Sequence, residues 1–390
     1  MEGIYLDNNA TTKLDDSVFV AMRRYLTTHF AHPSSPHCLG VKVRQKIEEA
    51  RDLVAVLLGT THPDEIVFTS GGTESINTAI RGTLAAVPTR RHIITTKVEH
   101  VSVLNLCRHL ASRGYRITYL SVNPDGMLDL EELRASLQED TALVSVMWAN
   151  NETGVLFPVE KIGEIVKEKG VLFHVDAVQA VGRVPICLRR FSQVDLLSLS
   201  GHKFHAPKGV GALFVRRGVE LHSLIFGGPQ ERNRRGGTEN VASIIGMGKA
   251  AELASIYFED ENTRVRGLRD KLERGLLQQI PQARVNGNRE CRIPNTTNIT
   301  FRGLDGGKLL KSMEDQGIYA SSGAARVDCK APSHVLLAMG LPPEDALASM
   351  RFGLSRYNAD GEIDYVVSSL RRIVSQLRTT INPMPRAVSQ

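Results

Sequence analysis

Residues 171–203 read VLFHVDAVQAVGRVPICLRRFSQVDLLSLSGHK, and this stretch decides the fold that the sequence predicts. It contains two short apolar runs, VLFHVD (171–176) and DLLSLS (195–200). Buried strands of a parallel sheet read as short, nearly continuous apolar runs of this kind. The stretch therefore predicts two buried strands, with Asp176 at the end of the first and Lys203 just after the second.

Five further apolar runs of similar length flank this stretch and are separated by helical patterns. They are EIVFTS (65–70), HIITTK (92–97), ITYLSV (117–122), ALVSVMW (142–148) and GALFVR (211–216). Strands that alternate with helices are typical of βαβ units, so the chain predicts an α/β fold with a mainly parallel seven-stranded sheet. After about residue 245 long helical patterns surround NTTNITFRG (295–303), which predicts a second, smaller α+β domain.

Length and composition narrow the class of protein. The chain has 390 residues, of which 42% are hydrophobic and 23% are charged, which is typical of a globular protein and favours two domains. No run is long and apolar enough to cross a bilayer, and the start, MEGIYLDNNATT, lacks the basic and apolar regions of a signal peptide. We therefore expect a cytoplasmic protein with no membrane partner.

The net charge of +6 raises the question of nucleic-acid binding. The arginine pairs are dispersed along the chain without interleaved aromatic residues, and such residues usually form a solvated face, so we expect no nucleic-acid partner. The cysteines never form Cys-x-x-Cys and lie far apart, so we expect neither disulfides nor a metal site. They are Cys38, Cys107, Cys187, Cys291 and Cys329.

The residues that follow each predicted strand are the candidates for chemistry, because open α/β sheets bind ligands at the carboxyl ends of their strands. The turn at 71–73, Gly-Gly-Thr, offers backbone N–H groups to an anion, although by itself it is equally typical of an ordinary helix N-cap. Asp176 needs a cationic partner, either in a salt bridge or as a protonated ring nitrogen. Lys203 is either a surface lysine or a desolvated nucleophile.

Taken together, these candidate residues indicate a function more specifically than each residue does alone. A cofactor with an aldehyde, a pyridine ring and a phosphate needs a lysine, a carboxylate for the ring nitrogen, an anion site and a flat group to stack on the ring. Lys203, Asp176, the 71–73 turn and His100 supply these groups, and all four follow predicted strands. This combination predicts an enzyme that uses pyridoxal 5′-phosphate (PLP).

Nearly the whole chain resembles the NifS/IscS-type cysteine desulfurases of the class V aminotransferase family, and it is more similar to the NifS branch. The matching segments are YLDNNATT, FTSGGTES, VEHVSVLNLC, VSVMWANNETGVLFP, FHVDAVQAVG, SLSGHKFHAPKGVGALFVRRG, RRGGTENV, PNTTNITF and RFGLSRYNADGEIDYVV. The resemblance implies PLP fold type I, with a large PLP-binding domain at 15–250. Residues 1–14 and 251–380 would form the small domain that carries the substrate loop, and 381–390 a tail.

The same resemblance implies that the enzyme cleaves the C–S bond of L-cysteine or a related amino acid, releasing alanine and transferring the sulfur to an enzyme thiol. Lys203 would bind the cofactor covalently, Asp176 would pair with its ring nitrogen, and His100 would stack on the ring and move protons. The cofactor and substrate would also contact Gly72, Thr73, Asn151, Gln179, Ser200 and His202, with Thr73, Ser200 and His202 at the phosphate.

On the substrate side, the resemblance implies that Arg351 binds the substrate carboxylate, with Arg356 as the second candidate. Thr238 would reach the phosphate in the neighbouring subunit, which implies a homodimer. A sulfur-acceptor or scaffold protein would be a further partner.

Two departures from the family pattern fall on this side. The family loop reads Ser-Ser-Gly-Ser-Ala-Cys, whereas this chain has Arg326 in place of the nucleophilic cysteine and Cys329 three residues later. His32 replaces an asparagine that lies close to the substrate carboxylate in the family.

Three interpretations of these departures remain open. In the first, which we prefer, Cys329 is a displaced nucleophile whose thiolate is favoured by Arg326. In the second, no enzyme thiol takes part, Arg326 binds a second anionic group of the substrate, and the reaction is C–S lysis, β-elimination or decarboxylation. In the third, the chain is a non-catalytic partner protein, which the complete cofactor set argues against.

Overall fold

The computed structural model describes residues 3–322 and 331–381. Its larger sheet has seven strands in the order β2-β8-β7-β6-β5-β3-β4. The strands are β2 (Ile66–Thr69), β3 (His92–Thr96), β4 (Arg116–Leu120), β5 (Thr141–Met147), β6 (Leu172–Asp176), β7 (Leu196–Ser200) and β8 (Gly211–Val215). β8 runs antiparallel to its two neighbours, β2 and β7, and all other neighbouring pairs in this sheet are parallel. The predicted α/β class and the mainly parallel sheet of seven strands are confirmed.

Both faces of this sheet are covered by helices, which explains why its strands read as continuous apolar runs. Ile66 and Phe68 pack into one core with α1, α2, α6 and α8, whereas Val67, between them, packs into a second core with α3 and α4. Side chains alternate between the faces of a strand, so one apolar run supplies both cores. These helices are α1 (Asp16–Thr27), α2 (Cys38–Leu58), α3 (Gly72–Ala86), α4 (Val101–Ser112), α6 (Val159–Glu168) and α8 (Val241–Ile256).

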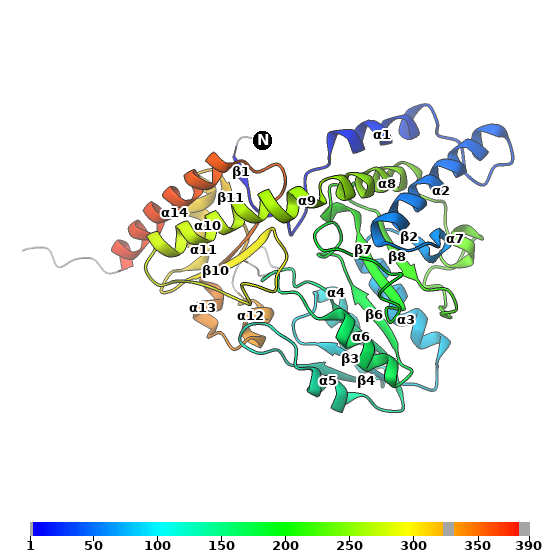
Figure 1. The fold of residues 1–390 in the computed structure, drawn as a ribbon, viewed down its shortest axis with the longest axis horizontal. Helices are drawn as coiled ribbons and strands as arrows, with labels where there is room; N and C mark the ends of the chain where they lie inside the picture. Colours follow the sequence, from blue (N-terminus) through cyan, green and yellow to red (C-terminus); the bar gives the residue numbers. More distant parts are fainter. Residues whose placement is uncertain (1–2, 323–330, 382–390) are drawn as a thin grey trace, which may run out of the picture.

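A third hydrophobic core lies apart from the large sheet and contains Leu6 as well as residues from Val265 onwards. Figure 1 shows α10, α11 and α14 gathered around β10 in this part of the molecule. The small sheet is antiparallel, in the order β12-β10-β9, and β1 pairs in parallel with β11. The helices and strands of this part of the molecule are β1 (Ile4–Tyr5), α10 (Arg266–Gln279), β9 (Ala283–Val285), β10 (Thr296–Phe301), α11 (Gly306–Asp315), β11 (Ile318–Tyr319), β12 (Ser349–Gly353) and α14 (Asp360–Ile381).

The N-terminal residues therefore pack with the C-terminal part of the chain, as the small-domain prediction requires, while the domain boundaries themselves stay a prediction. The remaining elements are short. They are η1 (Pro63–Glu65), α5 (Leu130–Ser136), η2 (Gly201–Lys203), α7 (Gln230–Asn233), α9 (Phe258–Asp260), the π-helical turn η3 (Glu261–Val265), α12 (His334–Ala338) and α13 (Pro343–Leu347).

Among the described residues, no single helix has the length and apolar character needed to cross a membrane. The pair Val241–Ile256 and Phe258–Gln279, bent by 58°, meets that requirement only when its two halves are taken together.

Candidate active site

A cavity of about 560 Å³ lies at the carboxyl ends of β5, β6 and β7, where the two parts of the molecule meet. It is lined by every predicted cofactor residue except Thr238, and by Arg351. The predicted residues at the cavity are Gly72, Thr73, His100, Asn151, Asp176, Gln179, Ser200, His202, Lys203 and Arg351. The structure thus brings together side chains that are spread over 280 positions of the sequence, from 72 to 351.

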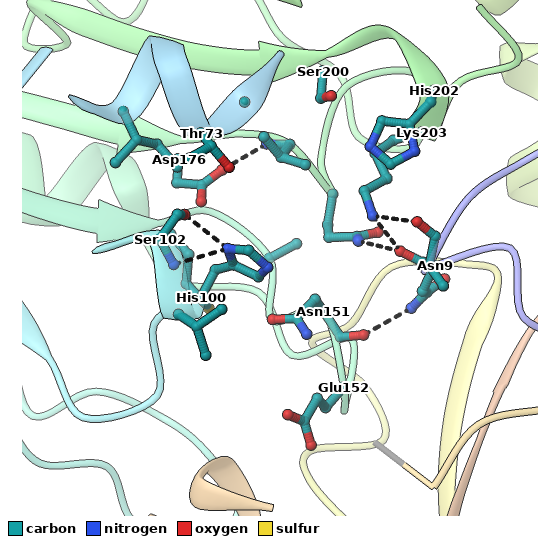
Figure 2. A pocket seen from close by; sticks show the side chains of 18 of the residues that line it. Asn9, Thr73, His100, Ser102, Asn151, Glu152, Asp176, Ser200, His202 and Lys203 are labelled. Carbon is teal, nitrogen blue, oxygen red and sulfur yellow. Dashed lines mark hydrogen bonds between the residues drawn. The ribbon is translucent and has the colours of Figure 1, made fainter. Parts of the chain in front are cut away.

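Lys203 ends the short helix η2, directly after β7. Its Nζ donates to the carbonyl oxygens of Asn9, at 2.7 Å, and Ala10, at 2.8 Å (Figure 2). Burial lowers the pKa of Lys203 to about 7, and the positive charges of Arg351 and Arg183 add to this effect. Lys203 is therefore far more often uncharged at neutral pH than an ordinary lysine, as a nucleophilic amine requires.

Asp176 is the last residue of β6, and its side chain is buried. Oδ1 accepts a hydrogen bond from the backbone N–H of Val178 at 2.9 Å. Burial raises the pKa of Asp176 to about 6, against the opposing effects of this hydrogen bond and of Lys203. Within the described part of the chain Asp176 forms no ion pair within 4.0 Å, so its carboxylate is left to interact with a cationic group in the cavity.

His100 is the N-cap residue of α4. Its Nδ1 accepts from the backbone N–H of Ser102 at 3.2 Å and lies 2.7 Å from the Ser102 hydroxyl. Because Nδ1 accepts a backbone N–H, the ring proton resides on Nε2. Burial, together with the charges of Lys203 and His334, lowers the pKa of His100 to about 4, so the ring is neutral at pH 7. Figure 2 shows this ring reaching into the cavity beside Asp176.

The start of α3 forms another part of the cavity wall. Gly72 is its first residue, and a Cβ atom placed there would lie 2.9 Å from Cγ2 of Val178 and 3.4 Å from Cβ of Ser200. A larger residue would therefore fill the space between α3 and the end of β7. The first turn of a helix has N–H groups without intrahelical acceptors, and with Thr73 and Ser200 they form a site suited to an anion.

Arg351, on β12, is only 6% exposed and lines the cavity from the side of the small sheet. Its Nη1 donates to the backbone oxygen of Asn151 at 3.1 Å, and among the described residues its buried Nε has no hydrogen-bond partner. Arg356 is placed differently: it pairs with Asp15 at 2.7 Å, packs over the ring of Tyr257 and does not line the cavity. The geometry therefore favours Arg351 over Arg356 as a ligand of an anion in the cavity.

Two predicted residues lie elsewhere on the surface. Nε2 of His32 is 3.3 Å from Oγ1 of Thr238, and both side chains are exposed, away from the residues that line this chain's cavity. Arg326 and Cys329 lie outside the described residues.

Several residues at the cavity were not singled out from the sequence. Glu152 and His334 line its wall, and Asn9 accepts hydrogen bonds from both Lys203 and Gln179 through its backbone oxygen. Asn9 belongs to the segment YLDNNATT, so the motif was visible, but its proximity to Lys203 was not. Glu99 lies directly before His100 and is fully buried.

The fold and this site together define an α/β protein with a desolvated lysine, a buried carboxylate and an anion site in one cavity. The chain matches the family model for aminotransferase class-V over residues 4–366, and it belongs to that family. The resemblance predicted from the sequence is thereby confirmed.

Individual proteins that are similar to this chain point to a narrower group within the family. The chain is 54% identical over 379 residues to a protein named cysteine desulfurase from Nostoc sp. (strain PCC 7120), an alignment that covers 97% of this chain and 94% of that protein. With the same coverage it is 51% identical to cysteine desulfurase NifS from Azotobacter vinelandii. Among solved structures, a NifS-like protein matches with a TM-score of 0.90 at 39% identity, covering 96% of this chain and 100% of that one. SspA in complex with cysteine matches with a TM-score of 0.80 at 33% identity, covering 91% and 100%.

Proposed function

We propose that this protein is a PLP-dependent cysteine desulfurase, which converts L-cysteine to alanine and transfers the sulfur to a thiol. The observation that carries the proposal is the convergence of Lys203, Asp176 and His100, from three strand ends, on one cavity with an anion site at Gly72. The names of the similar proteins from Nostoc and Azotobacter vinelandii support the same activity.

The residues at the cavity fit PLP. The volume of about 560 Å³ lies within the usual range for small-molecule sites. Lys203 would hold the aldehyde carbon, Asp176 the ring nitrogen, and the start of α3 the phosphate, where Gly72 leaves space that a Cβ atom would occupy. When bound, PLP supplies an electron sink that makes the α-proton of an amino acid acidic and weakens its Cβ–S bond.

Lys203 is suited to proton transfer, and His100 is suited to donating a hydrogen bond beside it. The Lys203 amine has a pKa of about 7, so it can accept a proton from the substrate and return it near neutral pH. His100 carries its proton on Nε2, because Ser102 holds Nδ1, and can donate a hydrogen bond from Nε2 to an atom in the cavity. Near neutral pH, His100 stays uncharged, whereas Lys203 gains and loses a proton.

Arg351 and Asn151 would bind the substrate on the side of the cavity that faces the small sheet. Nε of Arg351 is a buried donor without an acceptor among the described residues, and leaving such a donor unpaired is costly. A substrate carboxylate would supply this acceptor, in the charge-assisted geometry that a guanidinium favours.

Sulfur transfer needs a thiolate, and we assign this role to Cys329 on its place in the sequence, close to Arg326 and Lys330. The thiolate attacks the substrate sulfur and forms an S–S bond, while the Cβ–S bond breaks and its electron pair stays with Cβ. Protonation of Cβ then yields alanine, and the enzyme retains a persulfide. A sulfur-acceptor protein would remove the terminal sulfur.

A homodimer would place Thr238 at the phosphate of the neighbouring subunit. Thr238 and His32 are in contact with each other but do not line the cavity of their own chain. Large apolar side chains are also exposed on the N-terminal helices and nearby loops, which suits a face that a second copy covers. They include Phe19, Val20, Leu26, Phe30, Leu39 and Phe226.

The proposal is tested by incubating the PLP-loaded protein with L-cysteine and a reducing thiol, and by measuring alanine, sulfide and pyruvate. Wild type should form alanine and sulfide in equal amounts, and Lys203→Ala should form neither. Pyruvate in place of alanine would instead establish β-elimination, and no turnover with no bound PLP would establish a non-catalytic protein.

The role of Cys329 is decided by Cys329→Ala, with Cys291→Ala as the matched control, since Cys291 is exposed and lies outside the cavity. We expect alanine formation to fall at least about 100-fold in Cys329→Ala only. Unchanged alanine and sulfide in Cys329→Ala would remove Cys329 from the mechanism, and Arg326→Ala then tests whether Arg326 binds substrate.

A further inference from the structure

Glu99 connects the ends of two strands beneath the cavity. Its side chain is completely buried, between β3 and α4 and one residue before His100. Oε1 accepts hydrogen bonds from the Thr96 hydroxyl at 2.9 Å and from the backbone N–H of Met147, the last residue of β5, at 3.0 Å. Oε2 is also buried, and no described residue forms a hydrogen bond with it.

This environment disfavours an ionised carboxylate. A buried negative charge needs a cation or donors on both oxygens, and within the described ranges Glu99 has no ion pair. The charged form of Asp176, on β6, acts against the ionisation of Glu99. Cys107 on α4 and the histidines His100 and His334 are further titratable groups near Glu99. Burial lowers the pKa values of the two histidines and raises that of Cys107, so all three groups are kept uncharged.

Two carboxyl groups lie at the same edge of the sheet, Glu99 after β3 and Asp176 at the end of β6 with β5 between them, and their positions relative to the cavity differ. Asp176 lines the cavity, whereas Glu99 lies behind the wall and does not. Carboxyl groups that repel each other titrate at separate pH values, and the less solvated one keeps its proton to higher pH. Burial, followed by the charge of Asp176, raises the pKa of Glu99 to about 8, above the value of about 6 for Asp176.

The backbone of Glu99 also orients a side chain from a distant segment. Its carbonyl oxygen accepts a hydrogen bond at 2.9 Å from Nε2 of His334, the first residue of α12. Because Nε2 donates, this contact sets the tautomer of neutral His334. Glu99 thus lies between two histidines that line the cavity, one next to it in sequence and one bonded to its backbone.

We propose that Glu99 is a positioning residue that stays protonated at neutral pH, leaves the negative charge to Asp176 and holds the cavity wall between β3 and β5. The catalytic meaning of this inference rests on the proposed function, in which Asp176 pairs with the ring nitrogen of PLP. The protonation of Glu99 can be tested on the protein without PLP, so the two can fail separately.

The first experiment compares the denaturant midpoints of PLP-free wild type and Glu99→Gln between pH 5 and pH 8. Glutamine keeps the acceptor for Met147 and imitates the neutral acid. A group whose pKa is higher in the folded than in the unfolded state contributes stability at low pH and loses it as the pH rises towards the folded pKa. The midpoint of wild type should therefore fall relative to Glu99→Gln as the pH rises, and parallel curves would overturn the proposal.

Glu273→Gln is the matched control, because Glu273 is also buried but pairs with Arg292 at 2.7 Å. The pKa of Glu273 is lowered, so this variant should have a lower midpoint than wild type throughout the same pH range. Infrared difference spectra give a direct second reading. The difference spectrum of wild type minus Glu99→Gln at pH 7 should contain the C=O band of one protonated carboxylic acid, and the absence of this band from the difference would overturn the proposal.

The second experiment measures PLP affinity and alanine formation at pH 7 in Glu99→Ala and Glu99→Gln. We expect Glu99→Ala to lose at least about tenfold in both, and Glu99→Gln to restore most of that loss. Equal losses in the two variants would show that the charge is required and would overturn the proposal. If wild type does not turn over cysteine, the proposed function fails, while the pH and infrared measurements still decide the state of Glu99.

Discussion

Nη2 of Arg351 lies 2.7 Å from Oδ1 of Asp7, so an ion pair joins the N-terminal segment to β12 at the wall of the cavity. A second contact, to the backbone oxygen of Asn151, ties the same guanidinium to the loop after β5. The guanidinium is thus oriented from two sides before any substrate arrives. An oriented guanidinium loses little side-chain entropy when it binds an anion.

This arrangement leads to the first prediction, for Arg351→Lys. Lysine keeps the positive charge but cannot form two parallel hydrogen bonds with a carboxylate. We expect the KM for L-cysteine to rise about 10- to 100-fold, with a smaller change in kcat, as measured by alanine formation. Arg356→Lys is the control, because Arg356 pairs with Asp15 outside the cavity and should leave KM nearly unchanged. An unchanged KM in Arg351→Lys would exclude the assigned role.

The second prediction concerns the pH dependence of PLP loading. Only the uncharged amine of Lys203 attacks an aldehyde, and its folded-state pKa is about 7. The rate at which the PLP-free protein takes up PLP should therefore rise from pH 6 to pH 8 and then level off, followed as the absorbance of the lysine-bound cofactor. A rate that still rises tenfold per unit near pH 9 would place the pKa of Lys203 near its ordinary value.

The third prediction is that Asp176→Asn makes the PLP-free protein more stable but the enzyme less active. The pKa of Asp176 is raised to about 6 by burial, so its contribution to stability is largest at low pH and is lost as the pH rises through 6. Removing the charge should stabilise the PLP-free protein by about 1–3 kcal/mol at pH 7.5, measured by denaturant unfolding. Alanine formation should fall at least about 100-fold, because the ring nitrogen loses its anionic partner. A variant that is both less stable and fully active would contradict both expectations.

A buried ion pair outside the cavity supports the segment that carries Thr238. Arg51 pairs with Glu231 at 2.7 Å, and Glu231 also accepts from the backbone N–H of Phe68. Residues 231–233 all have positive φ angles, between 47° and 63°, which cost conformational energy that this pair helps to offset. Arg51→Ala should lower the free energy of unfolding by about 3–5 kcal/mol, because it leaves Glu231 buried without a cation.

The control for Arg51→Ala is Lys46→Ala, which removes an exposed ion pair with Glu49 on the same helix. It should change the free energy of unfolding by less than about 1 kcal/mol. Similar losses in the two variants would mean that burial of the Arg51–Glu231 pair has no special effect.

Subunit mixing tests where Thr238 acts. In a dimer of Lys203→Ala with Thr238→Val, the subunit with intact Lys203 receives an intact Thr238 from its partner if Thr238 acts across the interface. Co-expressed and doubly tagged heterodimers should then recover about half of the wild-type alanine formation, while both parent homodimers remain impaired. If Thr238 acts in its own subunit, the heterodimer has no complete site and recovers nothing.

The sequence by itself determined the elements and the cofactor half of the candidate site. Each strand of the large sheet is buried on both faces, so it had to be a short apolar run, and the helices between the runs implied a parallel order. Parallel strands bring their carboxyl ends to one edge, and this is why Asp176 and Lys203 could be placed together without coordinates.

Only the tertiary structure decided which long side chains reach the cavity and which charges they carry. Arg351 and Arg356 are five positions apart, and packing against Asp7 or Asp15 separates their roles. The carbonyl of Asn9 meets Lys203 across 194 positions, a contact that local patterns do not encode. The pKa of Glu99 depends on how strands from three parts of the chain exclude water from it, because desolvation is a property of the assembled core and not of the residue.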